Sequence, residues 1–125
     1  MTEQRASYCN LPWGLTVNGN PIPKGRPRVY QGRAMTPART REYETLVSQA
    51  AGIAWRGAPT NRLLSVTLRF YRANCIRCDI DNLTKAILDA LNGVVWEDDG
   101  QIVELRAVKG NDAERPRVEI TVDVA

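Results

Sequence analysis

The chain has 125 residues, of which 43% are apolar and 25% are charged, and its formal net charge is +3. These values are ordinary for a globular protein, and the length favours one domain over residues 1–125. The absence of histidine excludes Ser-His-Asp and Cys-His catalysis and histidine-type zinc sites. No signal-peptide pattern opens the sequence and no apolar run is long enough to cross a membrane, so we expect a cytosolic protein.

The first part of the chain predicts a short strand and then a basic loop. Trp13, Leu15 and Val17 alternate with polar or small residues, which is typical of a strand. The following stretch, NGNPIPKGRPR, is rich in turn-forming residues. Six basic residues and no acidic one then lie within this loop and the start of the next element: Lys24, Arg26, Arg28, Arg33, Arg39 and Arg41. Such a segment can bind the phosphates of DNA, and a solvated basic surface is the alternative.

A helix and a strand follow the basic loop. Thr36 is placed to act as N-cap and Pro37 to occupy the first helical position, and Gly57 is expected to end the helix. Apolar residues recur at helical spacing between them: Tyr43, Leu46, Val47, Ala50 and Ala54. Between positions 64 and 71 apolar residues alternate with mostly polar ones, which predicts a strand over residues 63–72 with one buried face.

The last part of the chain predicts one helix and two strands. Five apolar residues form a clean amphipathic stripe that Gly93 closes: Leu83, Ala86, Ile87, Ala90 and Leu91. Residues 102–109 form the next expected strand. The stretch RVEITVDV forms the last strand, with these side chains inward: Val118, Ile120, Val122 and Val124. The order β-α-β-α-β-β predicts an α+β fold, in which two helices cover one face of a mixed sheet.

Acidic residues gather around the second helix. Seven of them lie between positions 79 and 104, against Lys85 as the one basic residue: Asp79, Asp81, Asp89, Glu97, Asp98, Asp99 and Glu104. In an extended segment Asp79 and Asp81 point to the same side, about 6.6 Å apart, and can converge on one cation. We expect Asp81 to be the N-cap of the helix, with Lys85 and Asp89 one and two turns further on. An ordinary surface ion-pair ladder and a solvated EDDG turn are the alternative.

The cysteines do not predict a disulfide framework. There are three of them, Cys9, Cys75 and Cys78, and no secretion signal accompanies this odd number. Cys75 and Cys78 form a lone C-x-x-C, which falls short of a closed zinc site unless a dimer supplies two pairs. We interpret them as free thiols beside the acidic residues, with a zinc or redox module as the alternative.

Two motifs give the chain a family resemblance. The string DIDNLTKAILDALNG followed by W-x-D-D-x-Q-I resembles the RusA-type Holliday junction resolvases. The early P-x-P-K-x-R-P-R loop and the late Val108-Lys109 pair are also similar to members of this family. The resemblance covers residues 12–124, and the D-x-D-N-x-x-K and D-D-x-Q-I motifs are its most specific parts.

The resemblance implies a function and a site. These resolvases are small, homodimeric, magnesium-dependent endonucleases that are common in bacterial prophages and cut four-way DNA junctions in recombination and repair. By this resemblance Asp79, Asp81 and Asp99 are the catalytic, metal-binding aspartates, and Lys85 is the catalytic lysine. The two cysteines just before Asp79 are unusual, since a more basic approach there would help to hold DNA.

The chemistry of the residues agrees with this implication. Mg²⁺ prefers carboxylate, water and phosphate oxygens, and it can lower the pKa of a bound water where no histidine base exists. Lys85 would offset charge that develops on the phosphate. A non-catalytic nucleic-acid-binding protein with a solvated acidic face is the competing interpretation.

Overall fold

The computed structural model describes residues 11–25, 28–35, 37–74 and 77–125, with only the backbone of residues 28–30, 34 and 35. Its elements are the strands β1 (Trp13–Asn18), β2 (Arg28–Tyr30), β3 (Arg33–Met35), β4 (Leu64–Arg72), β5 (Ile102–Asn111) and β6 (Arg117–Val124), the helices α1 (Ala38–Ala54) and α2 (Ile80–Leu91), and the short 3-10 helix η2 (Asp99–Gln101). None of the helices in these ranges is long and apolar enough to cross a membrane.

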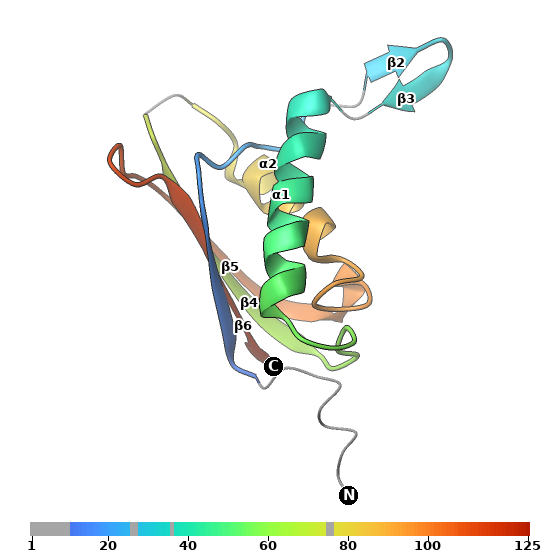
Figure 1. Cartoon of the computed structure of the whole chain (residues 1–125), viewed down its shortest axis with the longest axis vertical. Coiled ribbons are helices and arrows are strands. Elements are labelled where there is room, and N and C mark those ends of the chain that lie inside the picture. Colours follow the sequence, from blue (N-terminus) through green and yellow to red (C-terminus); the bar gives the residue numbers. More distant parts are fainter. Residues whose placement is uncertain (1–10, 26–27, 36, 75–76) are drawn as a thin grey trace, which may run out of the picture.

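A four-stranded mixed sheet is the base of the fold (Figure 1). Its strand order is β1-β6-β4-β5, in which β6 is antiparallel to both β1 and β4, while β4 and β5 are parallel. Parallel neighbours need a crossover connection, and α2 supplies it between β4 and β5. Because the two parallel strands run the same way, the start of α2 follows one end of the sheet and the start of β5 lies at the other.

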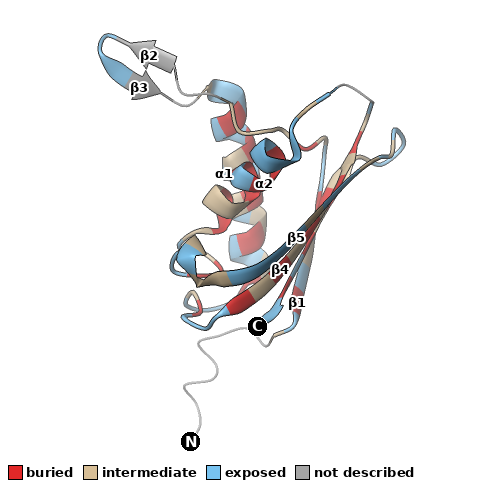
Figure 2. Ribbon diagram, turned by 180° about the vertical axis from the view of Figure 1, so that it is seen from behind, coloured by how far each residue is buried: buried red, intermediate tan, exposed pale blue. Residues whose placement is uncertain are grey.

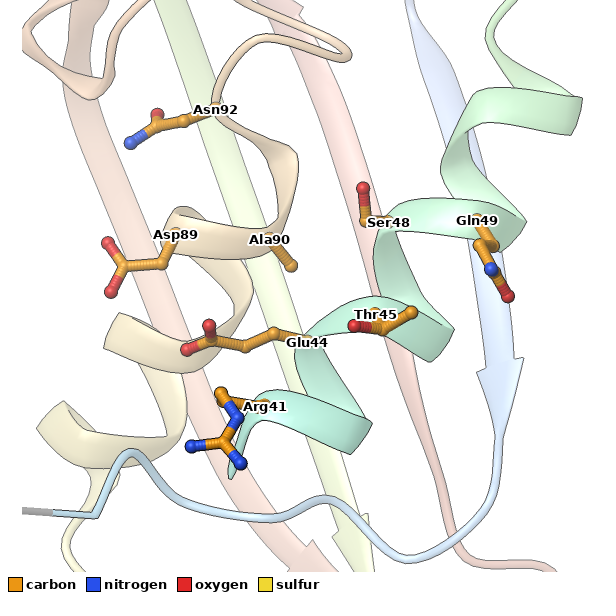
Figure 3. Close-up of a pocket in the computed structure, with 8 residues that line it drawn as sticks. All are labelled: Arg41, Glu44, Thr45, Ser48, Gln49, Asp89, Ala90 and Asn92. Atoms are coloured by element: carbon orange, nitrogen blue, oxygen red, sulfur yellow. The ribbon is translucent and has the colours of Figure 1, made fainter. Parts of the chain in front are cut away.

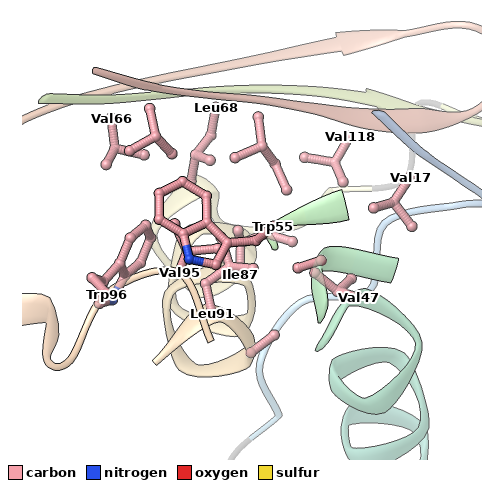
Figure 4. Close-up of a cluster of buried hydrophobic side chains, with 14 of the residues drawn as sticks. Val17, Val47, Trp55, Val66, Leu68, Ile87, Leu91, Val95, Trp96 and Val118 are labelled. Atoms are coloured by element: carbon pink, nitrogen blue, oxygen red, sulfur yellow. The ribbon is translucent and has the colours of Figure 1, made fainter. Parts of the chain in front are cut away.

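Both helices pack on one face of the sheet, and the core lies between these layers (Figure 2). The inner side chains of β4 alternate with half-buried outer ones along the whole strand, as expected for a strand with one covered face. Trp55 and Trp96 are among the largest fully buried side chains and lie between the helices and the sheet (Figure 4). The indole N–H of Trp55 donates to the Ala58 carbonyl (3.0 Å), so this polar atom is not left without a partner in the core.

The predicted α+β architecture and the order β-α-β-α-β-β are confirmed. In addition, the expected basic loop contains a two-stranded hairpin, β2–β3, which projects from the body beyond the start of α1 (Figure 1). Its turn residues, Gln31 and Gly32, both have positive φ, 52° and 80°. Two central residues with positive φ match the twist of a tight hairpin.

Several local predictions need correction. Leu46 is 47% exposed because it lies on the outer side of α1, whereas Tyr43 and Val47 are buried. The helix begins at Ala38, one residue after Pro37, and the expected N-cap Thr36 lies outside the described residues. Val124, which was expected to point inward, is 37% exposed as the last residue of β6.

Candidate active site

The acidic pair, Asp79 and Asp81, lies at the start of α2 and is exposed. Asp79 rather than Asp81 occupies the N-cap position, with an extended backbone and no side-chain capping hydrogen bond. The N-cap assignment of Asp81 was therefore wrong, since Asp81 belongs to the first turn and its carboxylate accepts from the backbone N–H of Asn82 (2.9 Å). Both carboxylates still benefit from the positive end of the helix dipole.

Lys85 lies one turn beyond the acidic pair and is joined to a cluster of charges. Its ammonium is 3.3 Å from Asp89, and the ammonium of Lys24 is 3.1 Å from the same carboxylate. Lys24 also contacts Glu44 of α1 at 2.8 Å. Arg41, Glu44 and Asp89 line a polar pocket of about 370 Å³ between α1 and α2 (Figure 3). Asp89 thus holds together two lysines that come from distant parts of the sequence.

The turn before β5 divides its two aspartates between different roles. The Asp98 carboxylate accepts from the Gly100 N–H (3.0 Å) and caps η2. The side chain of Gln101 in turn accepts from the backbone N–H groups of Glu97 (2.8 Å) and Asp98 (2.9 Å), which completes a capping box. The Asp99 carboxylate is half-buried and has no hydrogen-bond or ion-pair partner among the described residues.

Asp99 and the acidic pair lie at opposite ends of the parallel strands. Asp99 comes just before β5, whereas the Lys109 ammonium, near the far end of β5, donates to the Cys78 carbonyl (2.7 Å) beside the acidic pair. Lys109 is seven positions after Ile102, which is about 23 Å along the strand. Oxygen ligands of one divalent cation lie within about 5 Å of each other. Accordingly, no three Asp, Glu, Cys or His side chains in the described ranges converge to hold a metal ion.

The predicted basic residues divide into groups. Arg33 and Arg39 are exposed, on β3 and in the first turn of α1. The charge of Lys24 is taken up by Glu44 and Asp89, and Arg41 is exposed at the pocket beside the same carboxylates. Arg26 lies outside the described residues, and so does the side chain of Arg28.

Cys78 is a half-buried free thiol just before Asp79. Cys9 and Cys75 lie outside the described residues, so the interpretation of the C-x-x-C pair stays a prediction.

The motifs agree with a comparison against known families. The family model for Endodeoxyribonuclease RusA matches residues 18–123, most of the chain. The chain belongs to the RusA endodeoxyribonuclease family. The RusA match includes both motifs of the acidic cluster, and it makes this chain a member of a family of DNA-cleaving enzymes. The chain is also similar to the uncharacterized protein YqaN of Bacillus subtilis (strain 168), with 26% identity over 133 residues that cover 86% of this chain and 93% of YqaN.

Sequence reasoning missed two features of this RusA-family site. The hydrogen-bonding role of Gln101 was not foreseen, although the glutamine was visible in the W-x-D-D-x-Q-I motif. The separation of Asp99 from the acidic pair was missed as well, because closeness along the chain was taken for closeness in space. The crossover β4-α2-β5 was the available signal, since α2 and β5 begin at opposite ends of such a unit.

Proposed function

We propose that this protein is a Mg²⁺-dependent, structure-selective endodeoxyribonuclease that resolves four-way DNA junctions by paired phosphodiester cleavage in recombination and repair. One observation carries the proposal. Within the match to the RusA family, two exposed carboxylates, Asp79 and Asp81, lie at a helix start with Lys85 one turn away. The alternative is a protein that binds DNA without cutting it and whose acidic residues are simply solvated. The cleavage experiment below distinguishes the two functions.

The donor set of the acidic pair fits a hard divalent cation. Neither carboxylate of the acidic pair forms an ion pair with the described part of the chain, so their oxygens are available to a cation. Mg²⁺ bound there would supply a water of lowered pKa and stabilise charge on the phosphate. Lys85 would place a positive charge near the phosphate, and the exposed Arg33 and Arg39 would hold the DNA backbone.

We propose that a second copy of the chain completes each site. β5 is an edge strand of ten residues, on which Val103 is 55% and Leu105 48% exposed (Figure 2). Leu105 pairs with Val66 of β4 and so faces the helix-covered side of the sheet, yet it remains open at the edge. An unpaired, partly apolar edge is a template for another strand.

Antiparallel pairing of two β5 strands about a two-fold axis would bring the start of each strand to the end of its partner. Asp99 of one subunit would then lie beside the acidic pair of the other, close to the Lys109–Cys78 contact. A homodimer built in this way has two equal sites, which suits the two-fold symmetry of paired cuts in a four-way junction.

Cleavage of labelled four-way junctions, with Mg²⁺ and with a chelator, tests the proposal. The wild-type protein should nick the junction only with the metal, and Asp81→Asn should lower cleavage by about 100-fold or more while it still binds the junction. Asp123→Asn is the matched control, because the Asp123 carboxylate is exposed and likewise accepts from the next backbone N–H (2.7 Å). Junction binding without any metal-dependent nicking by the wild type would show a non-catalytic binding protein instead.

The two adjacent aspartates of the turn give a second test. Asp99→Asn removes a proposed ligand and should impair cleavage as Asp81→Asn does. Asp98→Asn should stay within about threefold of the wild type, because asparagine caps a helix as well as aspartate. Cleavage rates measured side by side decide the assignment, and a severe Asp98 defect beside a silent Asp99 change would reverse it.

A further inference from the structure

The side chain of Gln101 binds two separate segments of the backbone. Its oxygen accepts from the N–H groups of Glu97 (2.8 Å) and Asp98 (2.9 Å). Its nitrogen donates to the carbonyls of Thr60 (2.9 Å) and Arg62 (2.8 Å), in the segment that leads into β4. We call this four-bond contact the Gln101 latch, since it joins the turn before β5 to the approach of β4.

The latch uses the full capacity of a glutamine amide. That group has two N–H donors and one oxygen with two lone pairs, and each of the four has a partner here. Glutamate has the acceptors without the donors, and lysine has donors without an acceptor. Asparagine is one methylene shorter, so it cannot span the same two segments. The site is therefore specific for the residue type found in the D-D-x-Q-I motif.

The latch encloses Asp99 on both sides. Before Asp99, the side-chain oxygen of Gln101 fixes the backbone at Glu97 and Asp98. After Asp99, the backbone N–H of Gln101 donates to the Asp98 carbonyl (3.1 Å) and fixes the chain there. The Asp98 cap on Gly100 adds a further bond inside the same turn. The Asp99 carboxylate itself takes no part in these bonds. Thus the turn is rigid while this one carboxylate remains open to a ligand.

We infer that Gln101 is a positioning residue, which holds the turn so that Asp99 is presented to a divalent cation before that cation binds. The inference rests on the proposed function for the role of Asp99. It deepens that function by giving a role to Gln101, the fourth residue of the D-D-x-Q-I motif. Ligands that are held in place before binding hold a metal more tightly, because binding then does not have to order the backbone. Loss of the latch should therefore weaken metal binding by the folded protein.

The test compares Gln101→Met with the wild type and with Gln49→Met, in which the same change is made at an exposed residue of α1. The Mg²⁺ concentration for half-maximal junction cleavage should rise by about tenfold in Gln101→Met. It should stay at the wild-type value in Gln49→Met. Junction affinity in a chelator should be unchanged in both variants, because no phosphate contact is altered.

Amide hydrogen exchange in the metal-free protein gives a readout that does not depend on cleavage. The Asp98 amide should exchange faster in Gln101→Met, because the Gln101 side-chain oxygen is its acceptor. The Glu97 amide also donates to the Thr60 carbonyl (3.3 Å), so it should keep part of its protection. If the wild type cleaves junctions and Gln101→Met keeps the wild-type Mg²⁺ requirement, the positioning role is refuted. Unchanged exchange in Gln101→Met refutes the latch itself. A wild type without cleavage refutes the proposed function instead, and the exchange result still decides on the latch.

Discussion

Lys24 illustrates how one basic residue can serve the fold rather than DNA. Its ammonium lies between the carboxylates of Glu44 and Asp89, at 2.8 and 3.1 Å. Partial burial acts to lower the pKa of Lys24, but the hydrogen bonds to the two carboxylates outweigh it and raise the pKa above its ordinary value of 10.5. The charge is neutralised locally, so Lys24 is a poor candidate for a phosphate contact despite its place in the basic segment.

This arrangement predicts a pH-dependent loss of stability in Lys24→Met. A folded pKa above the unfolded one means that the stabilisation is complete below pH 10.5 and disappears as pH rises through the raised value. Near neutral pH the variant should unfold about 1 kcal/mol more easily. Thermal melts of both proteins from pH 7 to pH 11 should show the difference in Tm shrink at the alkaline end. A difference that stays constant across this range would contradict the prediction.

At the scale of elements, the strength of the apolar pattern decided what the sequence could predict. All five apolar residues of the α2 stripe are buried as expected, because their spacing leaves one possible inner face. α1 carries the weaker pattern, with many small residues, and Leu46 was assigned to the wrong face. The hairpin was missed because each strand has three residues and its Gln-Gly turn lacks the strong Asn-Gly signal.

The base of the hairpin is tied to the starts of both helices. The Lys24 N–H donates to the Asn82 carbonyl (2.8 Å) in α2, and the Gly25 N–H donates to the Thr40 hydroxyl (3.0 Å) in α1. The hairpin therefore leaves the body at the same end as the acidic pair, as Figure 1 shows. A DNA strand at the acidic pair would meet the hairpin and the first turn of α1.

The exposed arginines of this region should contact phosphate. Arg33→Ala with Arg39→Ala should weaken binding to junctions of every sequence. It should also reduce the slope of log affinity against log salt by about 0.9 for each phosphate that the variant no longer neutralises. Arg56→Ala is the matched control, because Arg56 is exposed just beyond the opposite end of α1. Titrations at several salt concentrations measure both quantities, and an unchanged slope in the double variant would exclude phosphate binding at these positions.

At the scale of the whole molecule, the sequence led to a proposal for the catalytic residues but not to an arrangement of them in space. The family resemblance implied that Asp79, Asp81 and Asp99 are the catalytic aspartates, but positions along a chain do not say how the side chains lie in space. The parallel register of β4 and β5 sends Asp99 to the far end of the sheet. In the proposed dimer, a symmetric partner at the β5 edge would bring Asp99 of one subunit to the acidic pair of the other, and the sequence pattern of one chain does not reveal such a partner.

A mixture of two inactive variants tests this shared site. In an Asp79→Asn homodimer and in an Asp99→Asn homodimer, each site lacks one aspartate, and both proteins should be inactive. After subunit exchange, a mixed dimer would combine intact Asp79 from one chain with intact Asp99 from the other in one site, while its second site would lack both. Equal amounts should therefore recover about a quarter of the wild-type sites and give singly nicked junctions rather than paired cuts.

Asp79→Asn mixed with Asp81→Asn is the matched control for this experiment. Both changes fall on the same acidic pair, so every site in that mixture retains a damaged pair and no activity should return. Nicking assays after co-refolding of each pair of variants measure the recovery. If each site were built from one chain, both mixed dimers would carry one defect in every site, and neither mixture would regain activity. Activity that returns in the mixture of Asp79→Asn with Asp99→Asn, but not in the control mixture, therefore requires a metal site that two subunits share.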